Sequence, residues 1–166
     1  MRSVKNQKLV NDVKIFGVSY KLDITYKYIK IPKLNIEEKV IKIMLPYKYK
    51  KIDNKTIVEL LINKMYDAIA EKELDTIMEK VRLTLKFAPE DFEIARIDKT
   101  LGKCFRDKII INPDIVAYKK ETIEYIIFHE FCYFKCRKHS KKFYDMIKSH
   151  VPNYQTYAYE VAGMQY

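Results

Sequence analysis

Apolar residues follow two different spacings along the chain, and the spacing changes near Asn54. Before that point, β-branched and aromatic residues partly alternate with polar ones over residues 13–30 and 39–45, as in antiparallel strands with one face in water. After it, apolar residues recur every three or four positions as far as Leu85, and Asn54 is a suitable N-cap residue. The pattern predicts a small antiparallel sheet followed by one long helix or two consecutive helices.

Two short apolar segments come after the helical region and indicate further strands. They cover residues 92–97 and 108–111, and the segment between them contains Gly102. Strands joined through a glycine-containing loop are typical of a β-hairpin. We therefore predict a hairpin that ends at Asn112-Pro113, because proline cannot continue a paired strand.

A second helical region covers residues 121–136. Apolar side chains occupy every side of this predicted helix, with polar interruptions at His129 and Glu130, so the helix is expected to be buried. Another short helix is expected to begin near Ser140 and to stop at Pro152. Strands followed by long helices predict the α+β fold class.

The length and composition favour one domain. The chain has 166 residues, three glycines and five prolines, and it shows no repeat and no flexible linker. We expect a single domain over residues 1–166, with a basic, strand-rich part over 1–51 and a helical part over 54–166. No apolar run approaches the roughly 18 residues of a membrane span, so a soluble protein is predicted.

The cysteines and the N-terminal sequence predict a cytoplasmic location. Cys104, Cys132 and Cys136 form an odd and sparse set that fits no disulfide framework. The first residues contain no apolar core of a secretory signal peptide. We therefore expect the cysteines to be thiols in a reducing compartment.

The positive charge is concentrated at the N-terminus. Residues 1–51 carry 13 Lys or Arg against 4 Asp or Glu, whereas the rest of the chain carries 19 against 18. Lysines there alternate with tyrosines, and such a surface could neutralise phosphates and stack on the bases of a nucleic acid. A general richness in Lys, Ile and Tyr, with solvated strand faces, is the simpler interpretation.

A candidate metal site lies on the second helical region. Two zinc ligands on one helix face are spaced four residues apart, and a glutamate directly after the first can take a proton from a zinc-bound water. Here His129 is followed by Glu130, but position 133 is tyrosine. A third ligand ten residues after the first is a known spacing, and His139 lies at that distance.

The stretch from Leu101 to Tyr154 resembles the YgjP-like and SprT-like zinc metallopeptidase family, which is related to the WLM peptidases. The segments that carry this resemblance, in chain order, are Leu101-Gly102-Lys103-Cys104, Ile109-Ile110-Ile111-Asn112-Pro113, Ile123 to Cys132, Lys138-His139-Ser140-Lys141-Lys142-Phe143 and Pro152-Asn153-Tyr154. The resemblance is specific over about a third of the chain, and Leu101 replaces the tryptophan of the family pattern.

The resemblance implies a minimal zincin-like fold, with the active-site helix beside a short sheet. It implies that His129 and His139 are zinc ligands, that Glu130 is the general base, and that position 133 holds the middle ligand. It also implies a peptide substrate, which we expect to lie along the edge of the strand at 109–111.

Tyr133 leaves three interpretations open. A bound cation can lower the pKa of a phenol, so a phenolate could ligate the metal. Alternatively, the site is degenerate and binds zinc poorly, or the tyrosine is an engineered substitution. Cys132 could also approach a metal, although a small side chain packed in the core explains it more simply.

The predicted function is therefore metal-dependent hydrolysis, as a zinc metallopeptidase with a degenerate site of weak or no activity. One alternative is a nucleotide pyrophosphatase of the UTP type, because relatives in the family have that activity and the basic N-terminal part could attract a triphosphate. The chain has no Gly-rich phosphate loop, however. A second alternative is a non-catalytic module that binds nucleic acid or protein. The sequence predicts no oligomeric state.

Overall fold

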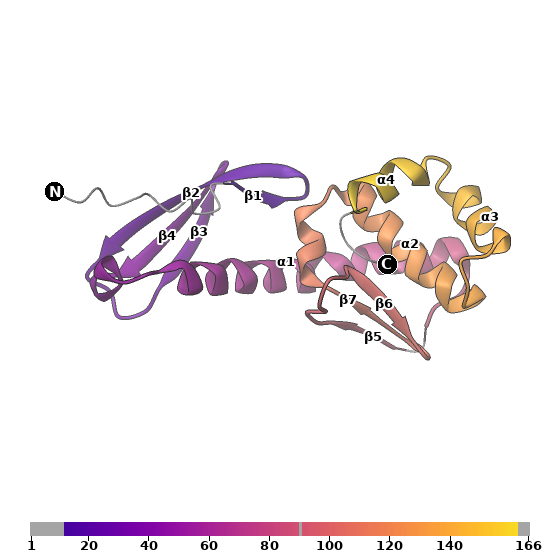
Figure 1. The fold of residues 1–166 in the computed structure, drawn as a ribbon, viewed down its shortest axis with the longest axis horizontal. Coiled ribbons are helices and arrows are strands. Elements are labelled where there is room, and N and C mark those ends of the chain that lie inside the picture. Colours follow the sequence, from indigo (N-terminus) through magenta and orange to yellow (C-terminus); the bar gives the residue numbers. More distant parts are fainter. Residues whose placement is uncertain (1–11, 90, 163–166) are drawn as a thin grey trace.

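The computed structural model describes residues 12–89 and 91–162, which form an α+β fold with four helices and two small mixed sheets. Figure 1 shows the two sheets at different ends of the molecule, joined by the long helix α1 (Lys55–Leu85). In the described part of the chain, no helix has the length and apolar character needed to cross a membrane.

The N-terminal sheet contains β1 (Asp12–Ile15), β2 (Val18–Lys27), β3 (Lys33–Glu37) and β4 (Val40–Pro46), in the order β1-β2-β4-β3. The sheet is mixed, so the predicted all-antiparallel arrangement is wrong. β3 and β4 pair as an antiparallel hairpin at one edge of the sheet. Within this hairpin, β4 is the strand that pairs with β2, and the two are parallel. Side-chain alternation is the same in both arrangements, so the sequence pattern did not distinguish them.

Helix α1 is one continuous helix of 31 residues, about 46 Å long at 1.5 Å per residue. Asn54 occupies the predicted N-cap position, but its side chain donates a hydrogen bond to the Tyr26 hydroxyl (2.6 Å) in place of a capping bond. The helix ends at Lys86, which has a left-handed conformation (φ 58°). Its buried residues are Val58, Met65, Tyr66, Ala70, Leu74, Met78 and Val81.

The second sheet contains β5 (Asp91–Ile94), β6 (Gly102–Phe105) and β7 (Lys108–Ile111), in the order β5-β7-β6. The predicted hairpin is wrong, because β5 and β7 are parallel and the hairpin is formed by β6 and β7. Strand β7 is therefore central. The edge strands are β5 and β6, so the segment 109–111, which we expected to present an edge, lies in the middle of the sheet.

The remaining helices lie around the predicted site, in which His129 and Glu130 are buried and His139 is exposed. Helix α2 (Lys120–Cys136) follows the short 3-10 helix η2 (Pro113–Ala117), and its residues from Thr122 to Cys132 are almost all buried, as predicted. Helix α3 (Lys141–His150) begins after Ser140, whose hydroxyl accepts a hydrogen bond from the backbone N–H of Phe143 at 3.4 Å. Helix α4 (Tyr154–Glu160), which the sequence pattern did not predict, packs against α2.

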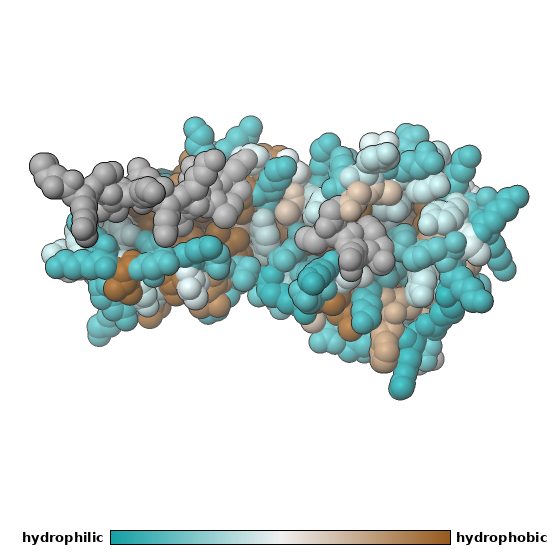
Figure 2. Space-filling view, in the orientation of Figure 1, coloured by the Kyte–Doolittle hydropathy of each residue, from teal (hydrophilic) through white to brown (hydrophobic). Residues whose placement is uncertain are grey.

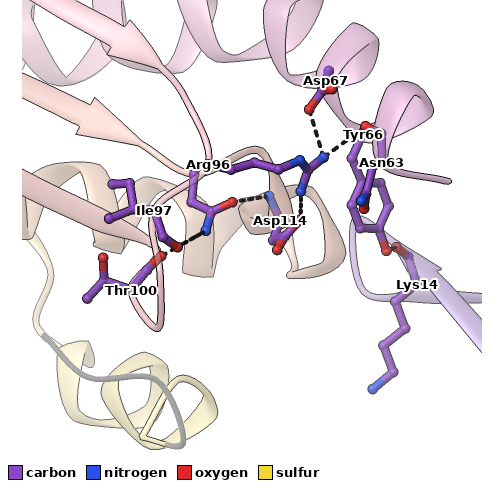
Figure 3. A network of polar contacts seen from close by, with 9 residues as sticks. Lys14, Asn63, Tyr66, Asp67, Arg96, Ile97, Thr100 and Asp114 are labelled. Atoms are coloured by element: carbon purple, nitrogen blue, oxygen red, sulfur yellow. Dashed lines mark hydrogen bonds and ion pairs between the residues drawn. The ribbon is translucent and has the colours of Figure 1, made fainter. Parts of the chain in front are cut away.

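Arg96 links the second sheet to α1 and η2. Its guanidinium donates to the Asp67 carboxylate (2.7 Å), to the Asn63 carbonyl (2.9 Å) and to the Asp114 carboxylate, as Figure 3 shows. Only the planar fork of arginine supplies donors in these directions at once. These contacts hold the segment after β5, helix α1 and the 3-10 helix η2 in fixed positions relative to one another.

The β1–β2 hairpin is fixed to the rest of the molecule by its backbone. The Phe16 and Gly17 amides donate to the Val116 and Ala117 carbonyls of η2 at 2.8 and 3.1 Å. The Tyr66 hydroxyl of α1 donates to the Lys14 carbonyl at 2.7 Å (Figure 3). The N-terminal sheet therefore has a defined position relative to the helices.

We expect Tyr66→Phe to lower the free energy of unfolding by about 1 kcal/mol near neutral pH, because it removes this hydrogen bond. Burial raises the pKa of Tyr66 from 10.0 to about 12. The neutral phenol is thus favoured in the folded state, and this contribution is complete below pH 10 and is lost as the pH rises toward 12. The difference between parent and variant should shrink over that interval.

Urea unfolding across the same pH range measures this difference. Tyr159→Phe is the matched control, because Tyr159 is 85% exposed and its substitution should change nothing. A constant difference between parent and Tyr66→Phe at all pH values would contradict the predicted shift.

Candidate functional site

Helix α2 places His129 and Glu130 in the interior, where their residues are 7% and 4% exposed. The two side chains contact each other, with His129 Nδ1 3.4 Å from Glu130 Oε1. A buried carboxylate is costly unless a polar partner is near, so this contact is an expected feature of the pair.

The chain reverses direction directly after α2. Arg137 adopts a left-handed conformation (φ 55°), and its backbone N–H donates to the Tyr133 carbonyl at 2.7 Å. This cap turns the chain back along the helix and places the His139 ring with its centroid 5.1 Å from that of His129. Zn–N bonds of about 2.0–2.1 Å at tetrahedral angles place two ligating imidazoles about 5 Å apart, so this separation suits a shared ion.

Tyr133 lies one helical turn after His129 and beside His139, with ring centroids 5.2 Å apart. Phe143 of α3, which is fully buried, contacts His129 and His139 edge-on at 5.0 and 4.9 Å. Tyr133 is 6.5 Å from the same ring. The structure therefore brings His129, Tyr133 and His139 together around Phe143, with Glu130 in contact with His129.

The surroundings favour the neutral form of the His139 imidazole. Burial lowers the pKa of His139, the nearby His129 lowers it further, and Glu130 opposes both effects. A neutral imidazole is the form that binds a metal ion. Tyr125, whose ring lies 6.1 Å from that of His129, has its pKa raised to about 12 by burial.

Gly102 of β6 sets the position of Glu130. A Cβ atom at Gly102 would lie 2.8 Å from Glu130 Cγ and 3.2 Å from its Cδ and Oε1. The backbone of the edge strand thus lies directly against the carboxylate, which is possible only without a side chain. The sequence motif contained this glycine, but its role depends on a contact between a strand and a helix that the sequence pattern does not reveal.

The donor set is one ligand short of a catalytic zinc site. Among the described residues, no three His, Cys, Asp or Glu side chains lie close enough to hold a metal ion. Catalytic zinc takes three protein ligands and a water. Cys132 does not complete the set, because it is fully buried in the core and burial raises its pKa to about 12.

The arrangement therefore offers two imidazoles, a phenol and a buried carboxylate beside an edge strand. Two imidazoles can hold a cation, and the carboxylate can accept a proton from water. The roles of His129, Tyr133 and His139 as ligands and of Glu130 as base stay predictions.

Comparison with known proteins identifies a family over nearly the whole chain. The family described as "YgjP-like, metallopeptidase domain" matches residues 3–162. No curated protein is significantly similar to the chain in sequence. Among solved structures, the metallopeptidase zymogen of Pyrococcus abyssi abylysin is similar with 16% identity and a TM-score of 0.49, over 52% of this chain and 90% of that one.

The contact between Gly102 and Glu130 predicts an unusual pair of mutational effects. Gly102→Ala should destabilise the protein by about 1–3 kcal/mol, because the new methyl group must displace a buried side chain. In a Glu130→Ala background the same change should be neutral or stabilising, since alanine restricts the unfolded chain and the φ of Gly102 is not left-handed.

Denaturant unfolding of the four proteins in this double-mutant cycle measures the coupling. A Lys103→Ala substitution on the same strand is the control, and it should change the free energy of unfolding by the same amount in the parent and in Glu130→Ala. If Gly102→Ala lowers the free energy of unfolding equally with and without the Glu130 side chain, Gly102 and Glu130 are not in direct contact.

Proposed function

The chain belongs to the YgjP-like metallopeptidase family, and from this premise we propose that it is a metal-dependent hydrolase with a degenerate peptidase site. In this proposal His129 and His139 hold zinc weakly, Glu130 is the proton acceptor, and Tyr133 stands where a third ligand belongs. Peptide hydrolysis is weak or absent until that ligand is supplied.

The observation that carries the proposal is the convergence of the two imidazoles, with centroids 5.1 Å apart, beside the buried Glu130. A buried histidine and glutamate could be ordinary core residues. A second histidine brought to them by a separate chain segment, on the far side of a turn, is not needed for packing. The family match supports the same interpretation.

Tyr133 explains why zinc binding should be weak. A phenol must lose its proton before its oxygen can bind zinc well, whereas an imidazole binds zinc in its neutral form. The phenol ring is also longer than imidazole, so its oxygen lies farther from the helix than a histidine nitrogen would. The loss of a residue that only hydrogen-bonds to a metal ligand already lowers metal affinity by about 10-fold to 100-fold, so the loss of a direct ligand should lower it further.

The edge strand β6 supports an extended peptide as the substrate class. Among the described residues β6 pairs with β7 alone, and we assign its other edge to the peptide. An extended peptide binds such an edge through its backbone. Because Gly102 lies against Glu130, a peptide paired with β6 has its backbone close to this carboxylate.

Zinc titration by calorimetry, with metal analysis of the purified proteins, tests the role of Tyr133. We expect Tyr133→His to bind zinc stoichiometrically and at least ~100-fold more tightly than the parent, because it restores the third ligand. Tyr133→Phe should bind as weakly as the parent. If the parent binds one zinc tightly and Tyr133→Phe loses it, the phenol is a ligand and the degenerate-site proposal is wrong.

Hydrolysis of an unstructured protein such as casein tests the role of Glu130. We expect Tyr133→His to cleave it, and Glu130→Gln in that background to lower the rate by about 10² or more, because the proton acceptor is lost. The double variant should still bind zinc, which separates a lost base from a lost site. Full activity in the double variant would rule out Glu130 as the base.

A further inference from the structure

A second surface lies at the free end of the N-terminal sheet. It is formed by residues 27–33, between β2 and β3, and by residues 46–52, which include the 3-10 helix η1 (Tyr47–Lys51). We call these two segments the lysine–tyrosine tip. They contain no Asp or Glu and six exposed lysines, namely Lys27, Lys30, Lys33, Lys48, Lys50 and Lys51.

These lysines carry uncompensated charge. Among the described residues none of the six forms an ion pair, whereas Lys42, farther along β4, pairs with Glu37. The molecule as a whole has a net charge of +10, and the tip contributes six positive charges to it. A concentration of one sign of charge attracts a polyanion.

Aromatic rings lie among these charges. Tyr28 is 93% exposed, and its ring lies 4.4 Å from that of Tyr47, with an angle of 33° between the planes. Lys50 Nζ lies 5.6 Å from the Tyr47 ring, and Lys48 Nζ lies 5.2 Å from the Tyr49 ring. Figure 2 shows this end of the molecule as hydrophilic side chains around a small hydrophobic area.

The tip is separate from the metal site. Helix α1 begins at Lys55, just after the tip, and runs for 31 residues, about 46 Å, toward the other sheet. Figure 1 shows α2, α3 and α4 at the opposite end of the molecule. A ligand of the tip therefore does not share the pocket of Glu130.

We propose that the lysine–tyrosine tip binds single-stranded nucleic acid. The lysines neutralise the phosphates of the backbone, and the exposed face of Tyr28 stacks on a base. A duplex hides its base faces, so it can use the charges but not the rings. The same combination of a basic surface and aromatic platforms is the one that sequence-tolerant single-strand binding requires.

Fluorescence anisotropy with a labelled oligothymidylate of about ten nucleotides tests the proposal on the full chain, over a series of salt concentrations. Replacing Lys30, Lys33 and Lys51 with Gln should reduce the slope of log K against log salt by about 2, at about 0.7 per phosphate contact. Tyr28→Ala should lower the affinity about tenfold. Glu130→Gln should change nothing, because the tip is remote from the metal site.

Matched controls test whether the binding depends on the lysine–tyrosine tip or only on the net positive charge of the chain. Replacing the exposed Lys64, Lys72 and Lys148 with Gln removes the same charge elsewhere, and Tyr159→Ala removes an equally exposed ring. Neither should alter the binding.

The proposal is overturned if the parent does not bind the oligonucleotide at low salt, or if the control variants lose as much affinity as the tip variants. It is also overturned if a duplex binds as tightly as the single strand. Binding to vesicles of anionic lipid in preference to the oligonucleotide would assign the tip to a membrane surface instead.

Discussion

The contact between the edge strand β6 and helix α2 is the constraint on which the candidate site depends. At Gly102 the strand backbone lies so close to Glu130 that no side chain fits between them. This contact confines the carboxylate in a buried position beside His129, where a less restricted glutamate would turn toward water. The strand that lies against the carboxylate is also an edge strand of its sheet, which is why we proposed it as the place for an extended peptide.

Two features position the histidines: the packing around α2 holds His129, and the turn after α2 brings His139 to it. Helix α2 is covered by α1, α3, α4 and β6, which holds His129 in place. His139 arrives only because the chain turns back at Arg137, and Phe143 then packs against both imidazoles. Tyr133 lies beside His139 in this arrangement, with ring centroids 5.2 Å apart, and in the proposed function its residue type is what leaves the site without a third ligand.

The sequence predicted the helical half of the molecule well and the sheets less well. The apolar residues around His129 and the N-cap at Ser140 are local signals, so α2 and α3 were predicted with nearly correct boundaries, and the family motif indicated which histidine would meet His129. The parallel pairings of β2 with β4 and of β5 with β7 depend on contacts between segments that are distant in the sequence. Alternation within one strand does not carry that information. The closeness of Gly102 to Glu130 was missed for the same reason.

The central claim is that imidazoles 129 and 139 form two thirds of a zinc site that position 133 leaves incomplete. Anomalous diffraction at the zinc edge, from crystals of Tyr133→His soaked with zinc, tests it most directly. We expect one strong peak bonded to the side chains at positions 129, 133 and 139, with the Glu130 carboxylate beside it. A peak elsewhere, or imidazoles 129 and 139 that point away from each other, would contradict it.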